Sequence, residues 1–323
     1  MLRWGIAATG GIARTVGRVI AAEPDMMVTA VGSRDAGRAR TLAADLGAMH
    51  AYGSYAELVR CPDIDVVYIA TPQSHHLEVA ELAIAAGRPV LCEKPLAATL
   101  ADAEKMVTLA REAGVFLMEA MWMRFNPLVR HLRELVVSGE LGRLRTVSAS
   151  FGLPVPERDH RLWNPALGGG ALLDLGVYPL GLACWLLGEP EVMTVTGAME
   201  NGVDAEAGIL LSYRDGARAL LDTSLISPLA NTAQVTGTRM RADLDGPFFA
   251  TERMVLTTAD GERREHVLEP GETGYVGEIR EVRDRLAEGA TESPVMPLDD
   301  SLAMMRLLED ARLRVTDPTG ARA

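Results

Sequence analysis

The first 120 residues alternate between short apolar runs, which are typical of buried strands, and patterns of helical period. Strands that alternate with helices predict a parallel, doubly wound sheet. Residues that favour helix ends stand at the boundaries between these segments. We expect strands at residues 2–8, 27–32, 65–70, 89–92 and 115–119, a weaker strand at 48–52, and helix ends at Ser54, Ser74, Thr99 with Asp102, Gly47, Gly87 and Gly114.

The pattern changes after about residue 122. Segments rich in Val, Thr and Leu then follow one another, and Asp-Gly pairs at 215–216 and 260–261 are typical of hairpin turns. Strands that are joined by short turns run antiparallel. We expect a helix at about 126–137, strands at 144–151, 191–199, 207–213, 217–225 and 232–237, a Gly-rich turn and helix at 168–187, and closing helices near 275–288 and 299–315.

The sequence therefore predicts two domains, in agreement with its length of 323 residues. Residues 1–122 should form an α/β Rossmann domain. Residues 123–323 should form an α+β domain with an open, mostly antiparallel sheet, whose final helix, about 299–315, packs back on the Rossmann domain. Apolar residues recur at every second strand position, as at Met193 and Val195, so a second copy should cover the open face. We expect a homodimer or homotetramer joined through this sheet.

Composition excludes several classes of partner. The net charge of −12, from 32 basic and 44 acidic side chains, makes nucleic acid and anionic membranes poor partners. Cys61, Cys92 and Cys184 are far apart and form no CxxC pair, so neither a disulfide framework nor a zinc site is expected. No signal peptide is visible, and the most apolar segment, 177–187, is too short to span a bilayer. A reducing, cytoplasmic location is predicted.

The first strand and the first helix are joined by Gly5-Ile6-Ala7-Ala8-Thr9-Gly10-Gly11-Ile12-Ala13, a G-x-A-x-x-G variant of the dinucleotide fingerprint. Small residues let the backbone approach a pyrophosphate, whose charge then lies at the helix N-terminus. A tight turn needs glycine even without a ligand, but the position of this turn at the start of an alternating pattern favours cofactor binding. The predicted contacts are Gly5, Ala7, Thr9, Gly10, Gly11 and Ile12.

The second strand ends in Ser33 and Arg34, where NAD-binding proteins usually carry an acid for the ribose 2′-hydroxyl. A guanidinium pairs well with a 2′-phosphate, a hydroxyl can add a hydrogen bond, and Arg38 follows one helical turn later. This combination favours NADP(H). In the alternative interpretation Arg34 is a solvated arginine, and Asp35 either binds the NAD ribose or caps the next helix.

Two further segments follow predicted strands, at the edge of the sheet where ligands bind. Thr71-Pro72 and His75 follow the strand at 65–70 and are predicted cofactor contacts, although His75 suits a surface position equally well. Lys94 follows the strand at 89–92, where Pro95 constrains the backbone and the flanking Glu93 is expected to hold the ammonium group. Glu93 and Lys94 are therefore predicted to lie near the cofactor.

Asp174 and Tyr178 form the second candidate pair. They are four residues apart and should share one face of a helix. Asp174 has apolar neighbours in the sequence, and a buried carboxylate is costly unless it is paired. A cationic partner or substrate hydroxyls are therefore expected beside it. The alternative is a capping aspartate and a core tyrosine.

Glu93-Lys94-Pro95, followed by GGGALLDLGVYP at 168–179, resembles the glucose-fructose oxidoreductase / inositol dehydrogenase (Gfo/Idh/MocA) family over nearly the whole chain. EAMWMRFNP at 119–127 is similar to a segment of the dimeric dihydrodiol dehydrogenases and NADP-dependent D-xylose dehydrogenases. The resemblance implies that Lys94 and Tyr178 are catalytic and that Asp174 orients the substrate. It further implies a substrate pocket with Trp122, Arg124 and Phe151, and a nicotinamide contact from Arg161 and Trp163.

These residue types suit the oxidation of a secondary alcohol. Tyrosine has a reference pKa of about 10, too high for a base at neutral pH, and a nearby lysine cation favours the phenolate. In the reverse direction the same pair protonates a developing alkoxide, and no metal is needed. The sequence thus predicts an NADP(H)-dependent dehydrogenase or reductase. Its substrate should be a small polyhydroxylated molecule: a sugar, a sugar derivative or a vicinal diol.

Two alternatives remain. The first is an NAD-dependent cyclitol or sugar dehydrogenase in which Asp35 contacts the ribose. The second is a dinucleotide-sensing regulator without turnover. The joint presence of Lys94, Asp174 and Tyr178 argues against a sensor, because a sensor has no need of an acid/base pair.

Overall fold

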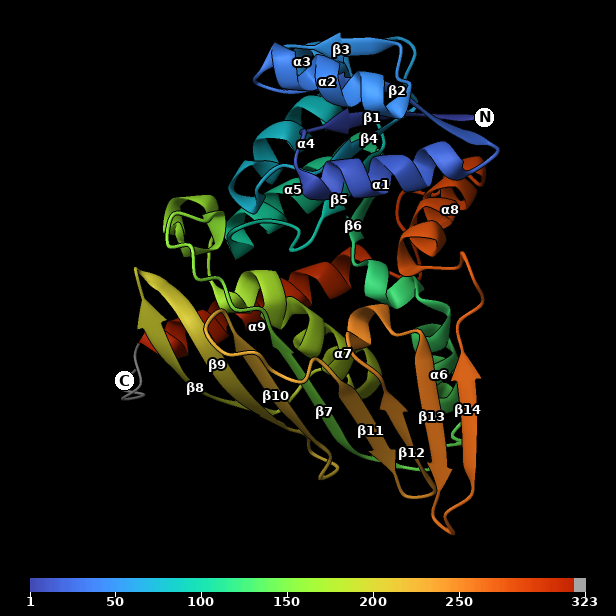
Figure 1. Ribbon diagram of the computed structural model, residues 1–323, viewed down its shortest axis with the longest axis vertical. Helices are drawn as coiled ribbons and strands as arrows, with labels where there is room; N and C mark the ends of the chain where they lie inside the picture. Colours follow the sequence, from blue (N-terminus) through green and yellow to red (C-terminus); the bar gives the residue numbers. More distant parts are fainter. Residues whose placement is uncertain (317–323) are drawn as a thin grey trace. The chain divides into compact units, whose positions relative to one another are not determined.

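The computed structural model describes residues 1–316 as two compact units (Figure 1). The first unit comprises Met1–Trp122 and Tyr275–Met305. The second unit comprises Met123–Gly274 and the described residues from Arg306 onward. The chain therefore leaves the first unit after Trp122 and returns to it at Tyr275.

The sheet of the first unit has six strands, all parallel, in the order β3-β2-β1-β4-β5-β6. The chain adds β2 and β3 on one side of β1, and then β4, β5 and β6 on the other side. The switch point at which such sheets bind ligands therefore lies between the carboxyl ends of β1 and β4. This topology confirms the predicted doubly wound sheet. The strands are β1 (Leu2–Ala7), β2 (Met26–Gly32), β3 (His50–Tyr52), β4 (Val66–Ile69), β5 (Val90–Glu93) and β6 (Leu117–Ala120).

Most helix ends of this unit follow from their capping residues. Ser54 and Thr99 each accept a backbone N–H three residues ahead, as predicted. The prediction for Ser74 is wrong, because Ser74 lies inside a 3₁₀ turn and its hydroxyl contacts His75 Nδ1 at 3.0 Å. The helices are α1 (Gly11–Ala22), α2 (Ala36–Leu46), α3 (Tyr55–Val59), the 3₁₀ turn η1 (Gln73–His75), α4 (His76–Ala85) and α5 (Leu100–Ala113).

Two later helices bring the chain back to the first unit. Helix α8 (Gly274–Ala287) is tied to it by ion pairs, among them Arg280 with Glu23 at 2.8 Å. Helix α9 (Leu298–Thr316) begins in the first unit, where Arg111 donates to Asp299 at 2.9 Å. Its remainder belongs to the second unit.

The second unit is built on an eight-stranded sheet in the order β14-β13-β12-β11-β7-β10-β9-β8. Neighbouring strands are antiparallel except for β7 and β10, which are parallel. The predicted open, mostly antiparallel sheet is therefore confirmed. The strands are β7 (Leu144–Gly152), β8 (Val192–Glu200), β9 (Val203–Ser212), β10 (Arg218–Ser224), β11 (Ala233–Gly237), β12 (Met240–Leu244), β13 (Arg253–Thr258) and β14 (Arg263–Val267).

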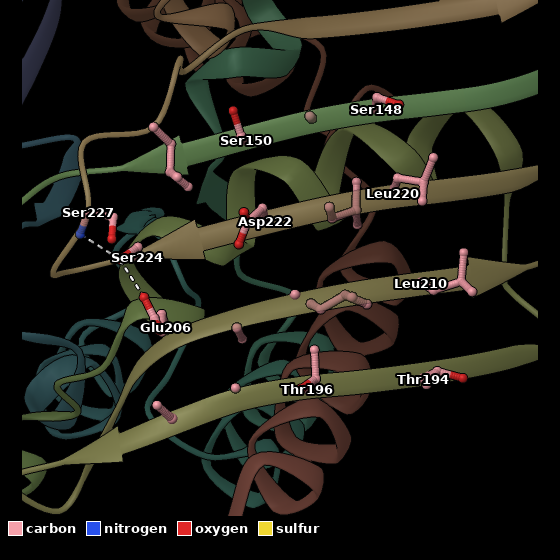
Figure 2. A pocket seen from close by; sticks show the side chains of 18 of the residues that line it. Ser148, Ser150, Thr194, Thr196, Glu206, Leu210, Leu220, Asp222, Ser224 and Ser227 are labelled. Atoms are coloured by element: carbon pink, nitrogen blue, oxygen red, sulfur yellow. Dashed lines mark hydrogen bonds between the residues drawn. The ribbon is translucent and has the colours of Figure 1, made fainter.

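The two faces of this sheet differ. Met193 and Ala219, which the sequence assigned to apolar strand positions, are buried, and helix α7 (Val177–Leu187) packs on β7 and β10. The opposite face carries mainly small and hydroxyl-bearing side chains together with Leu210 and Leu220 (Figure 2). It is hollowed by an open depression of about 920 Å³. Helix α6 (Pro127–Val137) also belongs to this unit.

The glycine-rich turn and helix that the sequence predicts at 168–187 are present, but the helix begins with a π-helical turn. The short turns η3 (Arg161–Trp163) and η4 (Pro165–Leu167) precede a π-helical turn, η5 (Leu172–Gly176), that continues into α7. The segment 177–187, expected to be too short for a bilayer, is part of the longer run Pro165–Leu187, which by length and composition could cross a membrane. Because 83% of its most apolar stretch is buried inside the fold, it serves here as a core helix.

Candidate cofactor and substrate sites

The turn after β1 has the features of an anion-binding site. Gly10 is the N-cap of α1 and makes no side-chain capping bond, and the first turn of the helix contains no acid. A side chain built on Gly10 or Gly11 would meet no atom within 4 Å, so open space lies beside the backbone. Backbone N–H groups are thus available to a phosphate, and a pyrophosphate fits this turn. Thr9 and Ile12, also predicted contacts, are half-buried beside it.

The geometry of this turn suits a different frame of the fingerprint from the predicted one. Gly5 lies inside β1, where a Cβ atom would approach Ile64 Cδ1 to 2.9 Å, and Ala7 is the buried last residue of that strand. Ala8 has a φ of +132°, in the region that glycine favours. Ala13 is fully buried where α1 meets the sheet. The roles of the three fingerprint residues therefore fall on Ala8, Gly10 and Ala13.

The end of β2 presents an exposed guanidinium. Arg34 Nη1 lies 3.1 Å from His75 Nε2, which joins two predicted cofactor residues from different loops. The Tyr55 hydroxyl is also near Arg34, and burial raises the pKa of this tyrosine. The hydroxyl of buried Ser33 accepts the backbone N–H of Asp35 at 3.2 Å. An exposed guanidinium that lies against an imidazole and a phenol is a suitable receptor for a phosphate dianion.

Asp35 is engaged with its own helix. Its carboxylate accepts the backbone N–H of Arg38 at 3.0 Å, and Arg38 Nε lies 3.4 Å from it. The hydrogen bond from the Arg38 backbone lowers the pKa of Asp35. Of the interpretations left open by the sequence, these contacts favour a helix cap over a ribose acid.

The loops after β4 and β5 are joined through a buried imidazole. His76 Nε2 lies 2.9 Å from the Thr71 carbonyl oxygen, and Nδ1 lies 3.2 Å from the carbonyl oxygens of Pro95 and Leu96. Burial lowers the pKa of His76 to about 4, so the ring is neutral at physiological pH. Within the described residues the buried Thr71 hydroxyl has no hydrogen-bond partner, and it is available to a ligand. Pro72 precedes the 3₁₀ turn that carries His75.

Lys94 is the residue after β5, and its surroundings fix the backbone on both sides. The buried carboxylate of Glu93 accepts the hydroxyl of Tyr68. Glu119, at the end of β6, accepts the backbone N–H of Leu96 at 3.0 Å. These bonds tie the Lys94 loop to β4 and β6, so the half-buried lysine projects from a rigid strand end.

In the second unit, Asp204 anchors the segment that bears the predicted catalytic residues. Its buried carboxylate accepts the Leu172 N–H at 2.6 Å and pairs with Arg312 at 3.5 Å. Gly170 has a φ of +126°, and a side chain there would clash with Asp204. Asp174 then lies in the π-helical turn and Tyr178 in α7. Both residues stand on one continuous helical segment, as expected, but Asp174 lies in a π-helical turn that the sequence did not predict.

Asp174 has the cationic partner that its apolar surroundings require. Arg161 Nη2 donates to Asp174 Oδ1 at 3.0 Å, and the aspartate side chain is only 12% exposed. The sequence predicted Arg161 as a cofactor contact and did not predict this pairing. Neighbouring Trp163 is buried and donates from Nε1 to the Val155 carbonyl at 2.8 Å, which holds the turn that carries Arg161 in the hydrophobic core.

Aromatic rings surround Tyr178. The Phe249 ring is stacked on it with centroids 4.5 Å apart, and the Phe151 ring stands edge-on at 5.8 Å. Phe151 and Phe249 also touch, at 4.4 Å between centroids. Phe151 was predicted for the substrate pocket, whereas Phe249 was missed. In the sequence, Phe249 could have been noticed only because it follows Phe248 in a chain that has five phenylalanines.

Trp122 and Arg124, both predicted for the substrate pocket, fall in different units. Trp122 stacks on Tyr275, with ring centroids 4.2 Å apart, inside the first unit. Arg124 is buried in the second unit, where its guanidinium lies 5.3 Å from the ring centroid of Trp185 in α7. Arg124 therefore packs against helix α7.

Comparison with known proteins agrees with this architecture. The model of an oxidoreductase family with an NAD-binding Rossmann fold matches residues 2–121, and that of the GFO/IDH/MocA C-terminal domain matches residues 129–243. Trans-1,2-dihydrobenzene-1,2-diol dehydrogenases are similar over nearly the whole chain. The Mus musculus protein is 39% identical over 99% of both chains, and the Bos taurus protein is 37% identical over 96% of both.

Solved structures share the fold. A 3-ketoreductase from Actinomadura kijaniata in complex with NADP and TDP-benzene is 28% identical, with a TM-score of 0.85 over 97% of both chains. An aldose-aldose oxidoreductase from Caulobacter crescentus, complexed with glycerol, is 26% identical, with a TM-score of 0.89 over 98% of both chains. With models of both family domains matched and relatives similar along its whole length, the chain belongs to the Gfo/Idh/MocA oxidoreductase family.

Proposed function

We propose that this chain is an NADP(H)-dependent dehydrogenase or reductase that acts on the CH–OH or C=O group of a sugar, a sugar derivative or a vicinal diol. The observation that carries the proposal is the combination of a buried, ion-paired carboxylate at Asp174 with a phenol at Tyr178 whose ring is lined by other aromatic rings. A site for a polyhydroxylated ring needs both a strong acceptor for hydroxyl groups and an apolar wall for C–H groups.

The first unit supplies the proposed cofactor site. The uncapped N-terminus of α1 receives the pyrophosphate, with Gly10 and Gly11 leaving room for it. Arg34 binds the 2′-phosphate, assisted by His75 and Ser33, while Asp35 stays with its helix. The similar 3-ketoreductase structure contains NADP, which supports this choice of cofactor.

NADP(H), when bound, supplies or accepts the hydride. We assign the accompanying proton to Tyr178, whose hydroxyl takes the proton of the reacting alcohol in oxidation and returns it in reduction. Lys94 acts with Tyr178, because a cation favours the phenolate and stabilises an oxyanion on the substrate. The bonds that hold Glu93 and Leu96 keep the lysine in one position through the reaction.

Substrate binding is assigned to the second unit. Asp174 accepts hydrogen bonds from substrate hydroxyls, and its ion pair with Arg161 holds the carboxylate in place for that purpose. Phe151 and Phe249 contact the C–H face of a sugar or the ring of an aromatic diol. Relatives named as dihydrodiol dehydrogenases and sugar oxidoreductases support this class of substrate.

We further propose that the protein is cytoplasmic and forms a homodimer or homotetramer through the open face of the second-unit sheet. Leu210 and Leu220 stand on this face with 38% and 47% of their surface exposed. The short side chains beside them on the flanking strands, Ser148 and Thr194, would let a second sheet approach closely (Figure 2). Asp222 lies on the same face, and partial burial raises the pKa of its carboxyl group, so this part of the face is already shielded from water.

A fluorescence screen for NADPH formation or consumption tests the proposal. The panel should contain aldoses, keto-sugars, and aromatic trans-dihydrodiols, and each should be tested with NADP(H) and NAD(H). We expect turnover with at least one member and a clear preference for NADP(H), with Tyr178→Phe as the inactive control. Turnover that is equal in Tyr178→Phe, or absent across all three classes, would contradict the proposed activity.

A further inference from the structure

Three side chains with metal-ligating atoms converge in the first unit, at its edge strand. His50 begins β3, Cys61 follows α3, and Asp63 lies in the loop before β4. One ligand atom from each, a histidine nitrogen, the Cys61 sulfur and an Asp63 carboxylate oxygen, lies within 4.8 Å of the others. The sequence predicts no metal site because its cysteines are isolated, but the β3–α3–β4 connection folds these residues together.

The separations suit a small tetrahedral ion. With metal–sulfur and metal–nitrogen bonds of about 2.3 and 2.0 Å, ligand atoms of a tetrahedral zinc site stand roughly 3.3–3.8 Å apart. The closest pair here, His50 Nε2 and Asp63 Oδ2, is 3.0 Å apart, and no pair exceeds 4.8 Å. Side-chain rotations alone can therefore bring all three atoms to bonding distance.

The surroundings provide access and support. Cys61 is buried, whereas the His50 and Asp63 side chains are 35% and 45% exposed, so an ion can enter from solvent on their side. Arg3 Nη1 lies 3.7 Å from Asp63 Oδ1, but its main partner is Asp65 at 2.7 Å, which leaves the other oxygen of Asp63 to the site. An arginine near a ligating carboxylate orients it without replacing the ion.

Tyr52 supplies a further contact. A hydrogen bond with Cys61 places the Tyr52 phenol hydroxyl against the sulfur. Its ring lies roughly parallel to that of His50, with centroids 6.1 Å apart. A hydroxyl donor to a thiolate sulfur stabilises its negative charge, as the neighbours of metal ligands commonly do.

We propose that His50, Cys61 and Asp63 bind one divalent cation of the zinc type, with water as the fourth ligand. The mixture of sulfur, nitrogen and oxygen ligands selects zinc or cobalt over magnesium or calcium. Binding forms a metal–thiolate bond and releases the thiol proton to solvent, with no change of oxidation state. The ion replaces the His50–Asp63 contact and clamps both ends of the segment that carries α3.

Titration of the purified, metal-free protein with Co²⁺, in a phosphine reductant, tests this site. We expect one Co²⁺ per chain, a thiolate-to-cobalt charge-transfer absorption, proton release, and displacement by Zn²⁺. Cys61→Ser should abolish the charge-transfer band, and His50→Gln should weaken binding by about tenfold or more. Cys184→Ser is the matched control, because this half-buried cysteine lies outside the cluster, and it should leave the titration unchanged.

Several results would overturn the proposal. The first is that the wild type shows no charge-transfer band at submillimolar Co²⁺. The second is that the band persists in Cys61→Ser. A band lost in Cys184→Ser would likewise place the ion elsewhere. Asp63→Asn changes a half-exposed side chain and keeps the shape of the cluster, so its reduced affinity confirms the site even if Cys61→Ser is unstable. Unchanged affinity in Asp63→Asn contradicts the three-ligand model.

Discussion

Arg34→Ala should weaken NADP binding by roughly ten- to a hundred-fold and leave NAD binding nearly unchanged. Arg34 is exposed at the end of β2, and its Nη1 atom lies 3.1 Å from His75 Nε2. A 2′-phosphate carries close to two negative charges, and NAD has none at this position. The variant therefore removes an interaction that only one of the two cofactors can make.

The expected magnitude follows from the geometry. A hydrogen bond to a charged group contributes about 1.5–3 kcal/mol, which corresponds to roughly ten- to a hundred-fold in affinity. Salt screens an exposed guanidinium, so we do not expect the full effect of a bidentate contact between Arg34 and the 2′-phosphate. Adding an acceptor for the ribose hydroxyl, in Ser33→Gly with Arg34→Asp, should reverse the preference to NAD, because the new carboxylate also repels the 2′-phosphate.

The assay is a titration of both cofactors by protein fluorescence or calorimetry at constant ionic strength. Arg40→Ala is the matched control, because Arg40 is an exposed arginine on the helix that follows, α2, and it should change neither affinity. If Arg34→Ala binds NADP as tightly as the wild type, or if the wild type prefers NAD, the end of β2 does not hold a 2′-phosphate.

Three further predictions concern stability and assembly. Ala8→Gly should raise the free energy of unfolding by about 1 kcal/mol in denaturant titrations, because it relieves a φ of +132°; a destabilised variant would contradict this strain. Between pH 6.5 and 4 the wild type should lose up to about 3 kcal/mol of stability, since the folded pKa of His76 is depressed to about 4 and the unfolded chain takes up the proton first. His76→Gln should flatten this loss, and an equal pH dependence in both proteins would refute it. Leu210→Asp with Leu220→Asp should produce monomers in light scattering, whereas the exposed control Val137→Asp should stay oligomeric; a monomeric wild type would remove the proposed interface.

The elements of the first unit could be predicted because their signals are local. Apolar runs, helix caps such as Thr99 and glycines such as Gly114 mark strand and helix ends within a few residues. Three strands of the second unit were missed, β12, β13 and β14, although the turn at 260–261 was recognised. In β12 the charged residues Arg241 and Asp243 alternate with apolar ones, and β14 is almost entirely polar. The apolar run of β13 is only three residues long, Met254–Leu256, so none of these short strands carries a long apolar signal.

The candidate sites depended more on long-range packing. Lys94, Asp174 and Tyr178 stand out from the sequence by their neighbours, whereas the partners of the latter two come from elsewhere in the chain. Arg161 reaches Asp174 from a separate turn, and Phe249 reaches Tyr178 from beyond β12. The sequence placed the three fingerprint positions on Gly5, Ala7 and Gly10, whereas the geometry favours Ala8, Gly10 and Ala13. The positive φ of Ala8 cannot be predicted from its residue type. Gly5 resembles a turn glycine in the sequence, but it packs inside β1.

The most direct test is a double-mutant cycle on kcat/KM with NADP(H) and the best substrate of the screen, using wild type, Lys94→Met, Tyr178→Phe and the double variant. Each single change should lower the rate by about 10²–10⁴-fold without weakening cofactor binding. Because the lysine acts partly through the phenol, the double variant should be scarcely worse than the poorer single one. Additive losses, or a single variant that retains a third of the wild-type rate, would contradict a shared role for Lys94 and Tyr178 in proton transfer.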